Sequence, residues 1–316
     1  MSTQGFWTIQ DQYHAIHSGQ WPSSEIDENY TATAAWRGGG SVGGSRVSSI
    51  DSLTFSTETT AASPAVLTIT RNNLEAANGN GFGWFGGGWT GSTSVSTMDR
   101  LSFSTQTVAS SSAVIGARSY HTAASSPGFG WFAGGGGGPR TNSINKLNIV
   151  SETTTLSPAT LSAAKLSLTG TTGNGYGWFA GGSTQTFPSV ITAAIDKINL
   201  AAEVRISFPS TLSSSRQRLG STTGAGSAWI SGGFTSAYAT PSTIDKLTFS
   251  TETRTLSSAV LTTSRTDNRG ASGGQGFGWF NVGATTDKLN FSSETLTLSP
   301  STFSLARGVF GIAASQ

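Results

Sequence analysis

The sequence predicts an all-β protein whose similar units close into a ring, and three observations lead to this prediction. Glycine occupies 41 of the 316 positions and charged residues make up only 11%, a composition that does not suit long helices. A tryptophan followed by small residues recurs six times, at intervals of 47 to 51 residues. Repeats of about 40 to 50 residues are typical of propeller blades, so we predict a six-bladed β-propeller.

Each unit contains four short runs that alternate apolar and polar residues or glycine, the pattern of half-buried β-strands. In chain order they are the stretch after a basic residue, the aromatic run that ends in glycines, a run containing Asp or Asn, and a Thr-rich run. A single blade cannot bury both of its faces. We therefore expect four-stranded antiparallel blades that pack radially against each other.

The two ends of the chain carry complementary parts of one blade. The first unit starts directly at the strand of Trp36, with no repeated base before it. The last unit ends with Arg307 and a further apolar stretch, 308–314. We predict that this C-terminal strand completes the first blade, which places the propeller at residues 31–316.

Three polar positions keep a fixed spacing in all units. An Asp or Asn follows each tryptophan, a Glu or Gln stands seven residues later, and a base comes 12 or 13 residues after that. The first position holds Asp51, Asp99, Asn145, Asp196, Asp245 and Asp287, and the base is Arg71, Arg118, Lys165, Arg216, Arg265 or Arg307. These residues either form equivalent ligand sites or hold turns and adjacent blades together. We favour the structural interpretation, because Asn145 and Lys165 preserve hydrogen-bonding shape while changing charge or reach.

An arginine, an aromatic run ending in Gly-Gly, and then an Asp before an apolar strand together resemble the kelch repeat, and the resemblance covers residues 31–316. The kelch pattern usually has a tryptophan late in the repeat, where this chain has leucine, as at Leu156, Leu256 and Leu298. The copies with Phe-Gly-Trp-Phe and Asp-Lys-Leu-Thr-Phe-Ser-Thr-Glu-Thr are also similar to kelch-like arrays in bacteriophage tail and fibre proteins. This second resemblance implies a virion structural protein.

Composition argues against several classes of function. A formal net charge of +2 without clustered bases does not favour nucleic-acid binding, and the absence of cysteine excludes thiolate chemistry and Cys metal sites. Ten of the sixteen carboxylates occupy the repeated positions, which leaves few residues for a convergent active site. We expect no enzyme activity, no metal site and no cofactor. Without a signal peptide or membrane-spanning stretch, we expect synthesis in the host cytoplasm and residence in the virion.

The segment between the tryptophan and the Asp or Asn is where the units differ most. Its length varies from 8 to 18 residues, and such connections of one type emerge on one face of a propeller. The sixth unit has only 283–286 there, which predicts a notch. Candidate ligand-binding residues in these segments are Trp89, Arg140, Phe187, Phe234 and Tyr238.

Residues 1–30 lie outside the repeats and are too apolar for a solvated tail, since they include Trp7, Tyr13 and Trp21. We expect an arm that either packs across the propeller or inserts into a partner, and we favour insertion into other virion proteins because the ring closes without it. The sequence thus predicts a non-enzymatic tail, baseplate or fibre component that serves as an interaction platform, with a variable face that engages either neighbouring proteins or a host-surface glycan. The alternative is a free lectin-like propeller.

Overall fold

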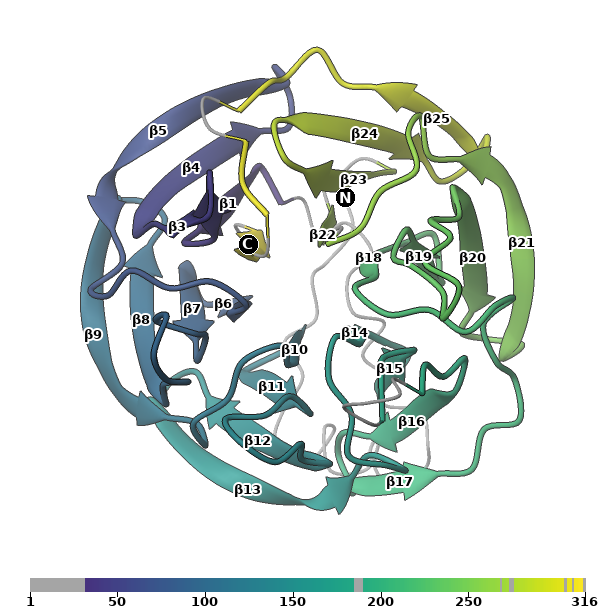
Figure 1. Ribbon diagram of the computed structural model, residues 1–316, viewed down its shortest axis with the longest axis horizontal. Coiled ribbons are helices and arrows are strands. Elements are labelled where there is room, and N and C mark those ends of the chain that lie inside the picture. Colours follow the sequence, from purple (N-terminus) through teal and green to yellow (C-terminus); the bar gives the residue numbers. More distant parts are fainter. Residues whose placement is uncertain are drawn as a thin grey trace, which may run out of the picture. The chain divides into compact units, whose positions relative to one another are not determined.

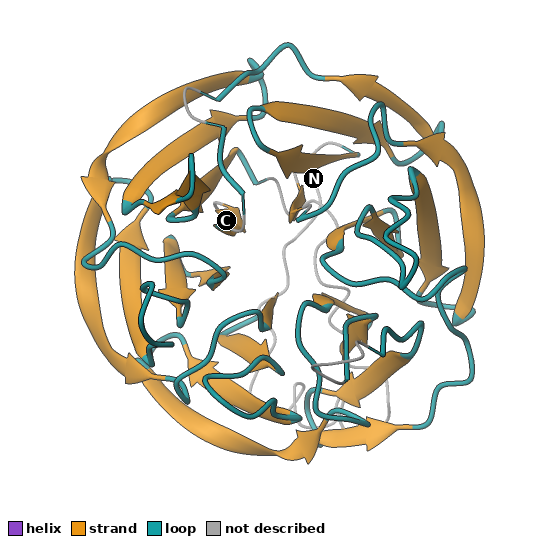
Figure 2. Cartoon of the chain, in the orientation of Figure 1, coloured by secondary structure: helices purple, strands orange, loops and turns teal. Residues whose placement is uncertain are grey.

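The computed structural model describes residues 32–184, 190–267, 269–272, 276–303, 306–308 and 310–314. The chain divides into two units, Met1–Tyr30 and Thr31–Gln316, and all described residues belong to the second. These residues form strands and connections without any helix, as Figure 2 shows, and so include no helix that could cross a membrane. The prediction of an all-β protein is confirmed.

Six sheets of four antiparallel strands stand around a common centre and form the predicted six-bladed propeller in the described part of the chain (Figure 1). From the centre to the rim, blade 1 contains β26 (Gly311–Ala314), β1 (Ala34–Gly38), β4 (Ser49–Thr54) and β5 (Thr59–Val66). Blade 2 contains β6 (Glu75–Gly79), β7 (Phe82–Gly86), β8 (Thr97–Ser102) and β9 (Thr107–Val114). Blade 3 contains β10 (Thr122–Ser126), β11 (Phe129–Ala133), β12 (Ser143–Asn148) and β13 (Thr153–Thr160).

The other three blades repeat this order. Blade 4 contains β14 (Thr169–Gly173), β15 (Tyr176–Ala180), β16 (Ile195–Asn199) and β17 (Val204–Ile206). Blade 5 contains β18 (Gly220–Gly224), β19 (Ser227–Ser231), β20 (Thr243–Thr248) and β21 (Thr253–Val260). Blade 6 contains β22 (Arg269–Ser272), β23 (Phe277–Val282), β24 (Thr285–Asn290) and β25 (Thr295–Leu298). A two-stranded hairpin of β2 (Ser41–Val42) and β3 (Ser45–Arg46) lies between β1 and β4.

The C-terminal strand closes the ring as the sequence predicts. Strand β26 pairs antiparallel with β1, with Ala313 opposite Trp36 and Gly311 opposite Gly38. The strand begins at Gly311 rather than at Gly308, because Gly308 instead forms an isolated bridge with Ser41 of the hairpin. Both ends of the propeller therefore lie in one sheet, and unfolding of either end breaks the first blade.

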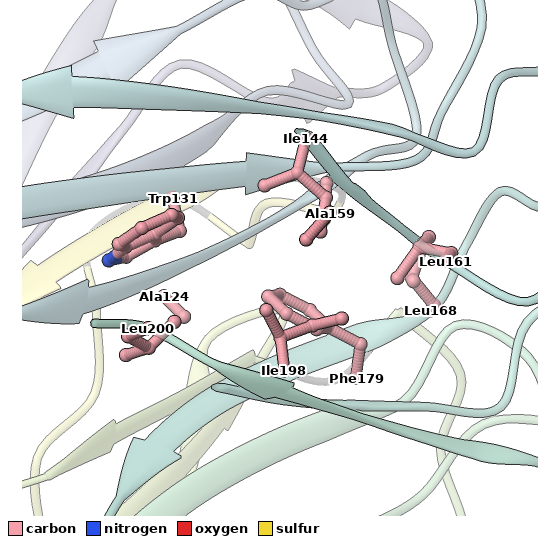
Figure 3. Packing of buried hydrophobic residues seen from close by; sticks show 10 residues of the cluster. Ala124, Trp131, Ile144, Ala159, Leu161, Leu168, Phe179, Ile198 and Leu200 are labelled. Carbon is pink, nitrogen blue, oxygen red and sulfur yellow. The ribbon is translucent and has the colours of Figure 1, made fainter. Parts of the chain in front are cut away.

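The hydrophobic core lies between blades rather than in one central mass. Figure 3 shows the packing between blades 3 and 4, where Trp131 and Ile144 of one blade face Phe179 and Ile198 of the next. Four of the six tryptophans also stack on an aromatic ring that directly follows the third strand of the next blade. The ring centroids of Trp178 and Phe249 are 5.7 Å apart. This stacking explains why the aromatic phrases recur together.

One face of the propeller carries both the connections between blades and those between the second and third strands. Isolated bridges join the two sets, as between Asn72 and Trp89. In all six blades the backbone N–H of a glycine after the second strand donates to the carbonyl of the base that opens the next blade, at 2.8–3.0 Å. Gly88 shows why glycine is needed, because its φ is +106° and a Cβ there would lie 2.9 Å from the carbonyl oxygen of Asn72. We call this side the variable face.

Candidate functional site

The repeated bases and acids form buried ion pairs in five of the six blades. The base just before the innermost strand reaches the Asp of the third strand, with N–O distances of 2.8 Å for Arg71 and Asp99 and 2.9 Å for Arg307 and Asp51. The other pairs are Lys165–Asp196, Arg216–Asp245 and Arg265–Asp287. Burial lowers the pKa of the arginines in these pairs, and the neighbouring carboxylate opposes the shift.

The same carboxylates also hold the connection that arrives from the preceding blade. Asp99 accepts hydrogen bonds from the backbone N–H and the hydroxyl of Thr68, at 3.1 and 2.6 Å. Asp245 accepts the corresponding pair from Ser213, both at 3.0 Å. The guanidinium of Arg71 also donates to the carbonyl of Phe85 at 2.9 Å. The charges are thus enclosed by partners from their own protein and present little to a ligand.

Blade 3 departs from this pattern at two positions. Asn145 replaces the carboxylate and accepts a hydrogen bond from Arg118 at 2.5 Å. Gly116 lies where the other connections carry Thr or Ser, so this connection lacks the hydroxyl that donates to the acid elsewhere. Burial lowers the pKa of Arg118 to about 10. The carboxylate and its hydroxyl donor have been lost together.

A second network joins neighbouring blades near the opposite face. In five blades a Glu after the third strand has positive φ and reaches a base on the third strand of the preceding blade, as in Lys146–Glu203 at 2.6 Å and Lys246–Glu294 at 2.7 Å. The others are Arg100–Glu152, Lys197–Glu252 and Lys288–Glu58. Most of these bases also lie over an aromatic ring of their own blade, for example Lys146 at 4.2 Å from the centroid of Phe129.

One seam of the ring lacks this second ion pair. Between blades 1 and 2 the base is replaced by Ser52 and the Glu by Gln106. Both charges are missing at the same seam, so neither is left buried without a partner. This paired loss indicates that the repeated Glu and Lys act on each other and not on a ligand.

Arg37 is a buried cation that the repeat pattern does not predict. It follows Trp36 at a position where the other blades have Phe or Ile. Its guanidinium donates to Asp51 and to the carbonyl of Gly283 at 2.7 Å, and it lies 3.5 Å from the ring centroid of Phe303. Burial, assisted by the charge of Arg307, lowers the pKa of Arg37 to about 9 against the opposing effect of Asp51. Arg37 thereby fixes blade 1 to blade 6 at the closure.

A cavity of about 60 Å³ lies among the innermost strands. Its lining includes Glu75, Thr122, Thr169 and Ser221. This volume is far below the roughly 300–1,000 Å³ of pockets that hold drug-sized ligands. Among the described residues, no group of three or more His, Asp or Glu side chains is placed to hold a metal ion.

The structure distributes the candidate ligand-binding residues over several connections of the variable face. Trp89 is half-buried and bridges Asn72 and Ser94 through its backbone. Arg140 donates to the hydroxyl of Ser183 at 2.9 Å, so its guanidinium is tied to the next blade. Phe187 of the candidate set and the arm residues Trp7, Tyr13 and Trp21 lie outside the described residues. The connection in blade 6 is Gly283–Ala284, shorter than expected because Thr285 already belongs to β24.

Phe234 and Tyr238 are the two candidates that the fold brings together. Their rings stack with centroids 5.9 Å apart and an interplanar angle of 11°. Arg218 lies beside Phe234, with its guanidinium carbon 5.6 Å from the ring centroid of Phe234 and 5.9 Å from that of Tyr120. Arg218 also pairs with Asp267 at 3.1 Å. We call Tyr120, Arg218, Phe234, Tyr238 and Asp267 the blade 5 cluster.

Arg218, Tyr120 and Asp267 belong to a ring of residues that the sequence did not single out as a site. In each of the five blades where the second residue after the base is described, that residue has positive φ, and these residues are Asn73, Tyr120, Ser167, Arg218 and Asp267. Backbone hydrogen bonds link them from blade to blade, from Tyr120 to Asn73 at 3.0 Å and from Arg218 to Ser167 at 2.7 Å. The only signal in the sequence is that this otherwise regular position changes residue type in every unit.

Comparisons with known proteins assign the chain to no family. No protein-family model matches it, and a search of the curated proteins finds no match. The six-bladed β-propeller is therefore shown by the structure and not by a family match. The functional argument must come from the residues of the variable face.

Proposed function

We propose that this protein is a non-enzymatic recognition propeller of a bacteriophage virion, in which a rigid ring presents the variable face to a host-surface glycan. The proposal rests on one observation, that the repeated residues and the variable residues lie in different parts of the propeller. The repeated charges are paired inside the ring, whereas the connections of one face differ in length and sequence and expose Tyr238 to solvent. A constant frame with one variable face is the arrangement expected of a binding platform.

The placement of the carboxylates supports a binding function over catalysis. The acids at repeated positions have bases or hydroxyls as partners, and outside these positions the described carboxylates are Glu75 and Asp267. Glu75 is buried at the small central cavity, and Asp267 is held by Arg218. Among the described residues, neither belongs to a group of three or more acidic or histidine side chains that could hold a metal ion.

The virion assignment rests on the resemblance of the repeats to kelch-like arrays of phage tail and fibre proteins. A closed ring without cysteine suits a particle that must persist outside cells, because its stability does not depend on redox conditions. In this proposal the arm, residues 1–30, anchors the propeller to other virion proteins as part of a tail, baseplate or fibre.

Electron microscopy of phage particles labelled with antibody against this chain tests the virion assignment. We expect label at a tail, baseplate or fibre. Deletion of residues 1–30 is expected to leave a folded propeller but to remove the label from particles, because the arm supplies the anchor. Glycan binding by the purified chain together with unlabelled particles would instead identify a free lectin-like propeller.

A further inference from the structure

We propose that the blade 5 cluster is the subsite of the variable face that binds a neutral saccharide, with Tyr238 as its stacking platform. This inference rests on the proposed function, because it assigns the glycan contact to one place and one chemical class. Three observations support it, namely the positive φ of Tyr238, the stacking of its exposed ring on Phe234, and the charge balance of the Arg218–Asp267 pair.

Tyr238 adopts a backbone conformation that does not favour its side chain. Its φ is +58°, in the left-handed region where glycine is the least strained residue. Every other described non-glycine residue with positive φ occupies a position that recurs between blades. The chain uses glycine freely at turns elsewhere, for example at Gly43 and Gly44 of the hairpin in blade 1. A strained tyrosine in a glycine-rich chain indicates that its side chain has a use.

The side chain of Tyr238 is displayed rather than packed. The residue is 82% exposed, the largest value among the exposed large apolar and aromatic residues of the described chain. The turn that holds it is fixed by backbone bonds, from the N–H of Tyr238 to the carbonyl of Thr235 and from the N–H of Thr235 to the carbonyl of Ala239, both at 2.9 Å. Stacking on Phe234 orients the ring. A fixed, exposed aromatic ring suits the apolar face of a sugar, where C–H groups pack on the π system.

The polar partners beside Phe234, the ring on which Tyr238 stacks, are balanced in charge. A single nitrogen of Arg218, Nη1, donates to both carboxylate oxygens of Asp267, at 3.2 Å to Oδ1 and 3.1 Å to Oδ2. The side chains of Arg218 and Asp267 are 36% and 18% exposed, so further donors and acceptors face solvent. An anionic sugar would meet Asp267 and a cationic ligand would meet Arg218. Hydroxyl groups can both donate and accept, so a neutral saccharide satisfies the pair without an uncompensated charge.

The neighbouring blade has no long connection that would cover this cluster. Blade 6, which supplies Asp267, joins its second and third strands through only Gly283–Ala284. The corresponding segment of blade 5 runs from 232 to 242 and carries both Phe234 and Tyr238. The cluster therefore lies beside the shortest connection of the variable face.

The test is binding of the purified full chain and its variants to an array of neutral, uronic, sialylated and phosphorylated saccharides. Wild type is expected to bind neutral members. Tyr238→Gly removes the platform and also relieves the strained φ, so we expect at least about tenfold weaker binding without a lower melting temperature. Asp267→Asn leaves a net positive charge and is expected to shift binding toward acidic saccharides.

Trp89→Ala is the matched control, since Trp89 is an aromatic residue of the same face in another blade. Loss of binding in Trp89→Ala with retention in Tyr238→Gly would place the glycan elsewhere on the face, which overturns the subsite but leaves the proposed function. Preference of the wild type for acidic saccharides would overturn the neutral class. Binding to no saccharide would overturn the proposed glycan function itself, together with the subsite.

Discussion

At the residue scale, the blade that departs from the repeated base–acid pair shows what this pair does in the other blades. Arg118 is the buried base whose partner on the third strand is an amide, Asn145, instead of a carboxylate. Burial lowers the pKa of Arg118 to about 10, which records the unfavourable environment of its charge. We expect Asn145→Asp to stabilise the protein by about 1 kcal/mol at neutral pH, because a charged acceptor replaces a neutral one.

Urea unfolding of wild type and Asn145→Asp measures this gain as a shift of the midpoint. The matched control is Asp245→Asn, which makes the reverse change in blade 5 and is expected to lower the midpoint. Equal midpoints for all three proteins would mean that the repeated acids contribute nothing through their charge.

At the scale of the element, each blade is joined to the next by packing of its tryptophan, a glycine–carbonyl hydrogen bond and, at most seams, a Glu–base pair. The seam between blades 1 and 2 has Ser52 and Gln106 in place of that pair. We expect Ser52→Lys and Gln106→Glu together to add a favourable coupling of about 0.2–1 kcal/mol, the usual value for a partly exposed pair. Either change alone adds one unpartnered charge and is expected to be neutral or destabilising.

A double-mutant cycle measured by chemical unfolding separates this coupling from the effects of the single changes. Repeating the cycle at high salt is expected to reduce the coupling, since partly exposed charges are screened. Additive effects in low salt would indicate that the Glu and base positions do not interact across the seam.

How much the sequence could predict differs between the elements and the site. The spacing of the tryptophans was sufficient to predict the blades, because each tryptophan packs on the next blade at a regular interval. The incomplete first unit likewise predicted closure by β26. Phe234 and Tyr238 were sequence candidates, but the rest of the blade 5 cluster could not be predicted, because Arg218 and Asp267 lie 49 positions apart and meet only once the ring has formed. The burial of Arg37 was not predicted, because no other unit has an arginine directly after its core tryptophan.

At the scale of the whole molecule, the Glu–base pairs predict how stability depends on pH. Burial alone would raise the pKa of Glu58, Glu203 and Glu294, but hydrogen bonds from a Lys and a Ser outweigh it and hold each pKa below the ordinary value of 4.5. The folded state therefore binds these protons less readily than the unfolded state. The stabilisation is complete above about pH 4.5 and is lost as pH falls through the lower folded-state values.

Unfolding midpoints measured between neutral and strongly acidic pH check this dependence. Replacing Glu58, Glu203 and Glu294 with Gln, the residue already present at position 106, is expected to lower stability at neutral pH and to flatten the acid limb. An unchanged acid limb in the triple variant would assign the pH dependence to other groups.

The central claim is that the repeated charges hold the ring while the variable face is free for recognition. The most direct test compares the thermal unfolding of Arg216→Gln with that of Tyr238→Gly. Arg216 is buried against Asp245, and breaking such a pair costs about 3–5 kcal/mol, so we expect the Tm to fall by about 10 °C. For Tyr238→Gly, relief of strain offsets the lost stacking, and stability is expected to change by less than about 1 kcal/mol. A large loss of Tm in Tyr238→Gly, with none in Arg216→Gln, would contradict the claim.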